Sequence, residues 1–280
     1  LEKVEGDPSH GYTRGKLCVK GYSYVNRVYS PQRLKYPMYQ DRRRPGKWRR
    51  ISWDEALDLI AHKILELKER YGSHGALALN KYSGNFGILY NAMEGLFYSL
   101  GDTTIADGTP CWSAGLDAFT YDFGSYETSD PEEMARAKLI ILWGVNPAWT
   151  AVHSLRFIYQ AREQGAKVVV IDPVRTITAR KAHYYLQVRP GSDGALALAL
   201  AKILVEENWH DLEFLKERTL GWETFLAYLE QFDLNQAAKA CGQDLKVIKF
   251  LAEMLGTIKP AFIWTGFGLQ RHQNGGQNLR

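Results

Sequence analysis

Short apolar runs alternate with amphipathic segments in the second half of the chain. The runs at 139–144 and 167–172 predict strands buried on both faces, and the segment 154–164 between them predicts a helix. A strand, a helix and a strand at this spacing predict a βαβ unit with parallel strands. Further strands are predicted at 184–188 and 260–266. The alternation predicts the α/β fold class.

Capping signals set the predicted helix boundaries. Ser52 with Glu55 fits a capping box at the start of a helix over 52–71, and Asp130 precedes Pro131 as an N-cap. A long helix begins at Ser192 or Asp193. Other helices are predicted at 87–100, 211–216, 221–229, 234–240 and 245–255, with a short buried strand at 76–80. Residues 1–50 lack sustained periodicity and predict loops with short strands.

Composition describes a folded protein with few thiols. Of 280 residues, 45% are hydrophobic and 24% charged, and the net charge is +4. The dense basic cluster at 41–50 is interpreted as a solvated loop, since no nucleic-acid-binding motif surrounds it. Cys18, Cys111 and Cys241 form no CxxC pair, which argues against a self-contained zinc site or disulfide framework. No apolar run is long enough to span a membrane.

The candidate chemistry lies in the loops that follow the predicted strands. No GxGxxG or GxxxxGK[ST] motif is present, which excludes the standard dinucleotide fingerprint and the P-loop. "RPGSD" at 189–193 is either an anion site at a helix N-terminus or a plain turn capped by Asp193. Asp172 either accepts hydrogen bonds from a ribose or base, or caps a turn. Together these loops suggest a ligand that contains a nucleotide.

Two cysteines, Cys18 and Cys111, each have more than one possible role. Cys18 lies in a glycine-flanked loop with little apolar material to bury it, and is either a packed thiol or a ligand. Cys111 lies among small residues in "GTPCWSAG", directly before Trp112, and could be a filler, a nucleophile or a ligand. Cys241 lies in a predicted helix and is interpreted as a packed thiol.

Seven segments, taken in order, resemble one family. They are "TRGKLCVKG", "ISWDEAL", "GTPCWSAG", "LWGVNPAWT", "KVVVIDPVRTITARKA", "VRPGSDGALAL" and "TGFGLQRHQNGGQ". The chain resembles the catalytic subunits of the DMSO reductase family, molybdenum or tungsten oxidoreductases with two molybdopterin guanine dinucleotides. The resemblance implies Rossmann-like parallel-sheet domains with a small N-terminal iron–sulfur domain remnant. It divides the chain into the remainder of the 4Fe-4S domain (1–50), the first part of domain II (51–107), domain III (108–258) and a return to domain II (259–280).

The resemblance also implies roles for individual residues. Cys18 matches the last of four cysteines that bind a 4Fe-4S cluster, with the other three expected before Leu1. Lys20 matches a lysine between cluster and pterin, and Cys111 matches the protein ligand to molybdenum or tungsten. Expected cofactor-binding residues are Ser83, Gly84, Asn85, Gly144, Asn146, Pro147, Ala148, Asp172, Pro173, Arg175, Thr176, Arg189, Pro190, Gly191, Ser192, Asp193, Gly266, Gly268 and Gln270.

The expected activity follows from the metal and its neighbours. Formate dehydrogenases of the family usually carry His after the metal ligand, and here Trp112 stands in that place. The prediction is a respiratory reductase of an oxo or sulfur compound such as DMSO, thiosulfate, polysulfide or nitrate. Formate dehydrogenase-like and acetylene hydratase-like enzymes are alternatives, and a metal-free nucleotide-binding module is the rival from another class. An iron–sulfur subunit and a membrane anchor subunit are expected partners, with a periplasmic or membrane-associated location favoured over the cytoplasm.

Overall fold

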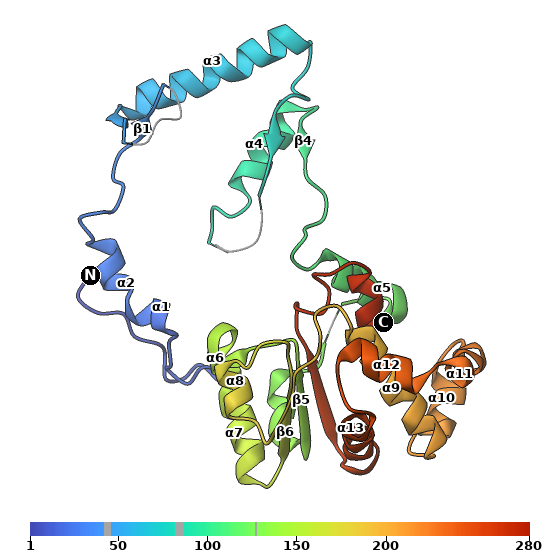
Figure 1. Cartoon of the computed structure of the whole chain (residues 1–280). Helices are drawn as coiled ribbons and strands as arrows, with labels where there is room; N and C mark the ends of the chain where they lie inside the picture. The colour runs from blue at the N-terminus through green and yellow to red at the C-terminus, as the bar shows by residue number, and fades with distance from the viewer. Residues whose placement is uncertain (42–45, 82–86, 127) are drawn as a thin grey trace. The chain divides into compact units, whose positions relative to one another are not determined.

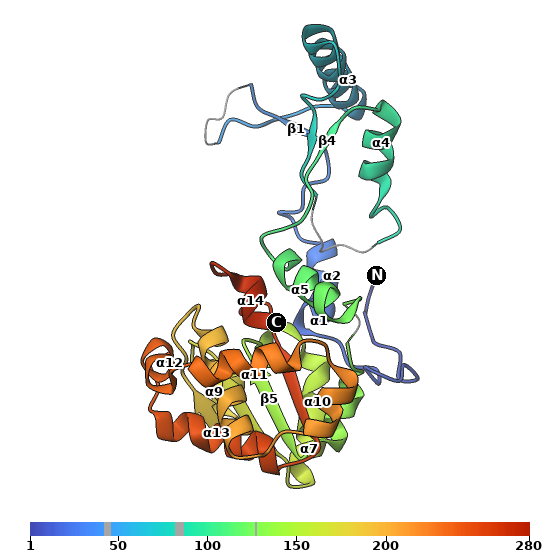
Figure 2. The same cartoon turned by 90° about the vertical axis from the view of Figure 1, so that its right-hand side faces the viewer.

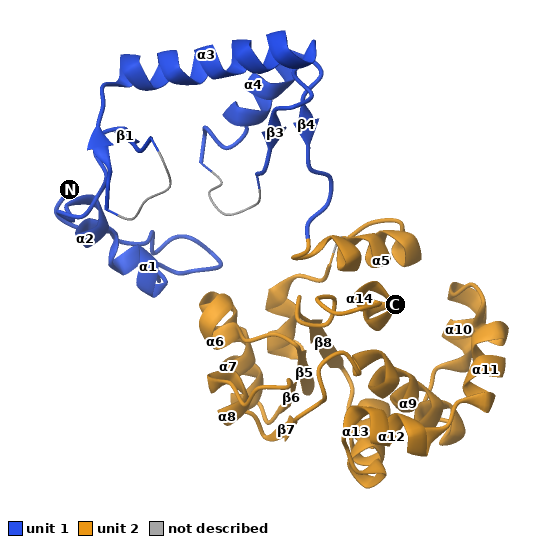
Figure 3. Cartoon of the chain, turned by 45° about the horizontal axis from the view of Figure 1, so that its top comes forward, with its two compact units in different colours: residues 1–109 blue, residues 110–280 orange. Residues whose placement is uncertain are grey.

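The structure is a computed structural model that describes residues 1–41, 46–81, 87–126 and 128–280. It divides the chain into two compact units, residues 1–109 and residues 110–280 (Figure 3). Cys111 therefore belongs to the second unit and Cys18 to the first. In the part of the chain that the structure describes, no helix combines the length and apolar character needed to cross a membrane.

A parallel sheet with the order β7-β6-β5-β8 forms the centre of the second unit (Figure 1). Its strands are β5 (Leu139–Trp143), β6 (Lys167–Ile171), β7 (Tyr184–Leu186) and β8 (Ala261–Thr265). In chain order this is the 3-2-1-4 arrangement of half a Rossmann fold. From β5, the next two strands are added on one side of the sheet, β6 and then β7. Strand β8 is added on the other side of β5. The predicted fold class is confirmed.

Alternate residues of the strands pack against helices on opposite faces of the sheet. Leu139 and Ile141 belong to a buried cluster with side chains of α9 (Asp193–Glu206), α12 (Leu234–Cys241) and α13 (Leu245–Thr257). Helix α7 (Leu155–Glu163) covers the other face (Figures 1 and 2). Since both faces are covered, β5 is buried at every position, which explains its uninterrupted apolar sequence.

Most predicted elements of this unit are present with shifted ends. The 3-10 helix η1 (Pro131–Arg136) begins after Asp130, whose side chain accepts from the Glu132 backbone N–H. Short helices follow β5 and β6, and two peripheral helices precede α12. These are α6 (Pro147–Thr150), η2 (Val152–Ser154), α8 (Ile177–Arg180), α10 (Leu212–Arg218) and α11 (Trp222–Gln231).

Two parts of the second unit differ from the sequence-based predictions. Helix α5 (Ser113–Phe123) follows Cys111 and was not predicted, because Trp112 at its N-cap makes no side-chain capping bond. Strand β8 pairs with β5 from Leu139 opposite Ala261 to Trp143 opposite Thr265. Strand β8 therefore shares a sheet with β5, whereas the sequence-based division assigns 259–280 to a separate domain. Helix α14 (Gly275–Leu279) follows it and contacts α5.

The first unit contains short elements and few buried side chains. It comprises α1 (Val19–Tyr22), α2 (Tyr24–Val28), β1 (Met38–Tyr39), β2 (Arg49–Arg50), α3 (Trp53–Tyr71), β3 (Ala78–Leu79), α4 (Ala92–Leu100) and β4 (Thr104–Ile105). The N-cap predicted at Ser52 is confirmed, since the Glu55 N–H donates to Ser52 Oγ at 3.0 Å, while Glu55 Oε1 accepts from Arg49 Nη1 at 2.9 Å. The predicted buried strand at 76–80 shrinks to the two residues of β3, with Ala78 exposed.

Candidate functional site at the carboxyl ends of the strands

The loops after β5 and β8 pack directly on each other where the strand order reverses. The Gly144 N–H donates to Ile171 O at 2.8 Å, and the Gly266 N–H donates to Trp143 O at 2.7 Å. A Cβ on Gly266 would lie 2.1 Å from Gly144 O, and one on Gly268 3.1 Å from the same oxygen. Gly144 itself has φ +63°. The glycines of both predicted loops are therefore needed for this backbone contact, at the point where α/β sheets bind ligands.

Side chains tie the loop after β5 to the helix after β6. Asn146 Oδ1 accepts from Thr178 Oγ1 at 2.5 Å, and the Ala148 N–H donates to the same hydroxyl at 3.2 Å. Pro147 is buried at the first position of α6. Thr178 is itself buried and was not predicted as a site residue. The predicted cofactor loops after β5 and β6 thus form one hydrogen-bonded group.

The loop after β6 presents a half-buried carboxyl group and an exposed cation. Asp172 Oδ1 accepts from the Val174 N–H at 2.8 Å. Burial raises the pKa of the Asp172 carboxyl, and the nearby Asp193 carboxyl raises it further. Arg175 is exposed, while Thr176 caps α8 by accepting from the Ala179 N–H at 3.1 Å. Pro173 O accepts from Gln187 Nε2 at 2.9 Å, which joins this loop to the segment after β7.

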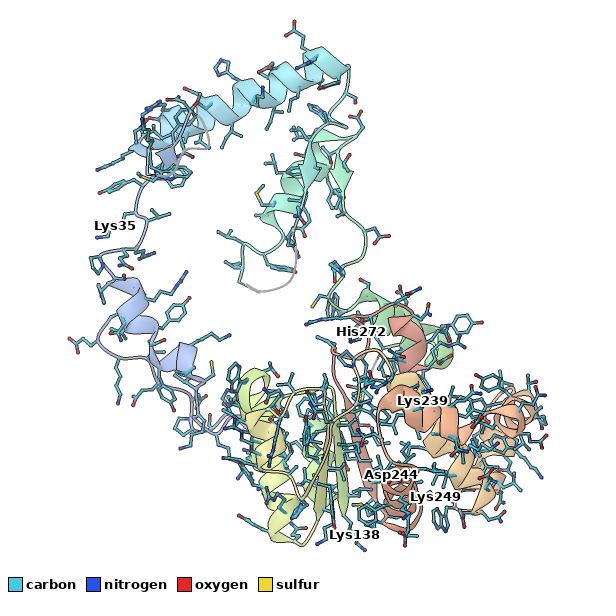
Figure 4. The ribbon with its side chains drawn as sticks, viewed as in Figure 1. Lys35, Lys138, Lys239, Asp244, Lys249 and His272 are labelled. Carbon is cyan, nitrogen blue, oxygen red and sulfur yellow. The ribbon has the colours of Figure 1, made fainter. Side chains whose placement is uncertain are left out.

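Asp193 is a buried acceptor and not the predicted helix cap. Trp143 Nε1 donates to Asp193 Oδ1 at 2.7 Å, and both side chains are buried. Burial raises the pKa of the Asp193 carboxyl, against the lowering effects of the Trp143 hydrogen bond and of the His272 charge. His272 lies on the segment between β8 and α14 (Figure 4), close to Gly191.

The turn at 189–193 is fixed from the end of α12. Arg189 Nη1 donates to Lys239 O at 3.2 Å, and the Arg189 N–H donates to Cys241 O at 3.0 Å. The guanidinium therefore satisfies a carbonyl at the helix C-terminus, where a cation is favourable. Ser192 Oγ donates to Arg189 O at 2.7 Å, while Pro190 and Gly191 are exposed. Cys241 is fully buried, in agreement with a packed thiol.

Cys111 is exposed and is contacted by the segment after β8. Arg271 Nη2 donates to Cys111 Sγ at 3.0 Å, and Arg271 Nε donates to Cys111 O at 3.2 Å. The adjacent Gln270 is buried, and its Oε1 accepts from the Gly115 N–H at 2.6 Å. The structure thus brings the predicted metal ligand together with one predicted residue, Gln270, and one unpredicted residue, Arg271.

An aromatic cavity of about 620 Å³ adjoins this loop in the second unit. Its lining includes Trp112, Phe119, Tyr126, Trp264, Phe267 and Gln270. Trp112 and Phe267 meet edge to face, with their ring centroids 6.0 Å apart. The side chain directly after the predicted metal ligand therefore packs on the post-β8 loop beside an apolar space.

The predicted iron–sulfur residues lie in the first unit. Cys18 immediately precedes α1, and hydrogen bonds from the Gly21 and Lys20 backbone N–H groups lower the pKa of its thiol. A lowered pKa favours the thiolate, the form that binds iron. Lys20 is exposed. The predicted pterin contacts Ser83, Gly84 and Asn85 lie outside the described residues.

Comparison with known proteins decides between a metal enzyme and a metal-free nucleotide-binding module. A family model described as molybdopterin oxidoreductase matches residues 33–280, and one described as the molybdopterin oxidoreductase Fe4S4 domain matches residues 1–30. This chain belongs to the molybdopterin oxidoreductase family. The family assignment indicates a molybdopterin cofactor and a 4Fe-4S cluster, and confirms the resemblance that the seven segments predicted.

Relatives of the molybdopterin oxidoreductase chain are longer proteins. Probable oxidoreductase YoaE of Bacillus subtilis (strain 168) is 36% identical over all of this chain and 41% of its own length. Dimethyl sulfoxide reductase DmsA of Escherichia coli (strain K12) is 31% identical over 96% of this chain and 37% of its own. Acetylene hydratase from Pelobacter acetylenicus has the same fold, with a TM-score of 0.77 and 24% identity, over 98% of this chain and 38% of its own. The chain therefore spans about two fifths of these proteins.

Sequence reasoning missed several residues that organise the molybdopterin oxidoreductase site. They are Trp143, Thr178, Arg271 and His272. "QRH" at 270–272 places two basic side chains directly after a glycine-rich strand-end loop, a signal that could have drawn attention to Arg271 and His272. In the sequence, Trp143 is only the last apolar residue of a predicted strand, and no motif predicts its hydrogen bond to Asp193. The individual cofactor-binding roles stay predictions.

Replacing Gly266 by alanine tests the contact between the loops after β5 and β8. The added Cβ would overlap Gly144 O, a backbone atom that cannot move without shifting β5. We expect G266A to lower the free energy of unfolding by about 1–3 kcal/mol, measured by urea denaturation. G268A is the graded control and should cost less, because its Cβ lies 3.1 Å from that oxygen. Equal stability of G266A and wild type would contradict the contact.

Replacing Asp193 tests the buried carboxyl group and its indole partner. Because the folded-state pKa is raised, wild-type stability should fall, relative to D193N, as the pH rises through the titration range of this carboxyl. D193N keeps an acceptor for Trp143 and should be at least as stable as wild type at pH 7. D193A leaves the indole N–H unpaired and should cost about 1–3 kcal/mol. Thermal unfolding of the three proteins at pH 4, 5.5 and 7 measures the pH dependence and the cost of the unpaired indole. A pH-independent difference in stability between wild type and D193N would refute the raised pKa of Asp193.

Proposed function

We propose that this chain is part of the catalytic subunit of a molybdenum- or tungsten-dependent respiratory reductase of an oxo or sulfur compound. One observation carries the proposal: the second unit presents an exposed thiol, Cys111, beside the loops at the sheet reversal, in a chain of the molybdopterin oxidoreductase family. Thiolate is a soft ligand and suits a molybdenum or tungsten centre. When bound, the metal cofactor supplies the two-electron chemistry with substrate.

The residues present fit a cofactor that carries a nucleotide on each pterin. Asp172 and Asp193 are carboxyl acceptors, and the charge of Asp193 contributes to the raised pKa of Asp172. Arg175 is an exposed cation able to meet phosphate. Glycines 144, 266 and 268 keep side chains out of the space where the loops after β5 and β8 meet. In this proposal Asp172 binds the guanine or ribose, and Arg175 binds phosphate.

The single-electron path of the proposed enzyme begins in the first unit. Cys18 would supply one thiolate to the 4Fe-4S cluster, and the charge of Lys20 would stabilise the electron between cluster and pterin. Electrons would come from an iron–sulfur partner subunit with a membrane anchor subunit. A periplasmic or membrane-associated location is part of this proposal and is favoured over the cytoplasm. Trp112 stands where formate dehydrogenases of the family carry histidine, which supports a reductase over a formate enzyme.

Metal content and turnover of the Cys111 variant test the proposed function. The full-length protein, purified without oxygen, should contain molybdenum or tungsten together with pterin. It should oxidise a reduced viologen dye with DMSO, thiosulfate, polysulfide or nitrate as acceptor. C111A should lose this turnover, because it removes the thiolate that would hold the metal. C241A is the matched control and should keep it, since Cys241 is a buried packing thiol.

Three results would count against the proposed function. Wild-type protein without molybdenum, tungsten or pterin would remove the metal cofactor and favour the metal-free nucleotide-binding module. Wild-type turnover in C111A would remove the ligand role of Cys111 while leaving the cofactor in place. Turnover with formate alone would assign the chain to the formate dehydrogenase alternative.

A further inference from the structure

Arg271 contacts the proposed metal ligand through two of its nitrogen atoms. Nη2 donates to Cys111 Sγ at 3.0 Å, and Nε donates to Cys111 O at 3.2 Å, although the two residues are 160 positions apart. We propose that Arg271 is a positioning residue: it holds the Cys111 sulfur in place for binding a metal and puts a positive charge beside that sulfur. The proposal rests on the proposed function, because it assumes that Cys111 is the ligand.

The segment that carries Arg271 is held on both sides. Before it, the buried Gln270 accepts from the Gly115 N–H, so the chain is fixed to the start of α5. After it, a Cβ on Gly276 would lie 3.0 Å from Ala114 O, which shows how closely α14 approaches α5. Arg271 therefore acts from an anchored backbone.

The two hydrogen bonds explain why arginine suits this position. A planar guanidinium can donate to the sulfur and to the carbonyl of the same residue, which fixes both the side chain and the backbone of Cys111. Lysine, with a single ammonium group, would keep the positive charge but could not make both hydrogen bonds to Cys111 in this geometry. Hydrogen bonds to a ligand sulfur withdraw electron density and stabilise the reduced metal, so they raise its reduction potential.

The proposed role leaves folding stability nearly unchanged. Both Arg271 and Cys111 are exposed, and exposed charged contacts contribute little to stability. A merely structural role would change the thermal midpoint of unfolding and leave the metal's potential alone. The positioning role predicts the opposite pattern, which separates the two explanations.

The experiment compares R271Q, R271K and R280Q in the full-length holoenzyme. Metal content is measured by mass spectrometry, and the metal's midpoint potentials are measured by a redox titration followed through its EPR signal. R271Q should keep the metal, shift the potentials to more negative values and lose about 10–100-fold in turnover. R271K should shift less. R280Q removes an arginine directly after α14, whose Nε donates to Asp122 Oδ1 at 2.9 Å, and should match the wild-type potentials.

The outcomes separate this inference from the proposed function. Wild-type protein without metal would end both. Metal-loaded R271Q with wild-type potentials and EPR signal would end only the role of Arg271, and so would an equal shift in R280Q. Loss of metal from R271Q that R271K restores would support the role, because the retained cation then holds the ligand loop. Equal loss of metal in all three variants would show disruption of the whole segment and would overturn it.

Discussion

The functional half of the chain depends on the packing of the β5 and β8 ends at the reversal of the sheet. Parallel strands need both faces covered, and the helices after β5 and β7 provide this cover. The return of β8 beside β5 then forces two loops together, and only a glycine at 266 allows the Gly144 carbonyl so close. This contact fixes the direction of the segment 266–275, and that segment reaches Cys111.

Local patterns predicted the sheet because each strand is a short apolar run with its own turn signal. Strands β5 and β6 are buried almost throughout, so their sequences leave no alternative to a covered strand. The place of β8 beside β5 could not be predicted in the same way, since it depends on pairing across more than a hundred residues. Helix α5 escaped prediction because its N-cap, Trp112, offers no capping side chain. Strand β3 was overestimated because its apolar residues lack a covered face.

In the candidate site, too, local sequence indicated some residues, while the contacts between distant segments could not be predicted. Strand-end position was enough to draw attention to Asp172, which directly follows β6, and the "RPGSD" turn before a helix drew attention to Asp193. Their environments were not predictable, because the bond from Trp143 to Asp193 and the contact of Arg271 with Cys111 join distant segments. Family resemblance supplied the role of Cys111, and packing supplied its partner.

The two thiols of the proposed electron path are supported in different ways. Cys111 belongs to a unit with an extensive buried core, and its loop is fixed by side chains from the segment after β8. Among the described residues of the first unit, Ile51 and His74 are the buried ones. Leu57 and Ile60 of α3 are exposed. The Cys18 loop is organised by backbone N–H groups of its own helix. The Cys111 loop therefore draws its geometry from tertiary packing within the second unit, and the Cys18 loop draws its geometry from local backbone structure.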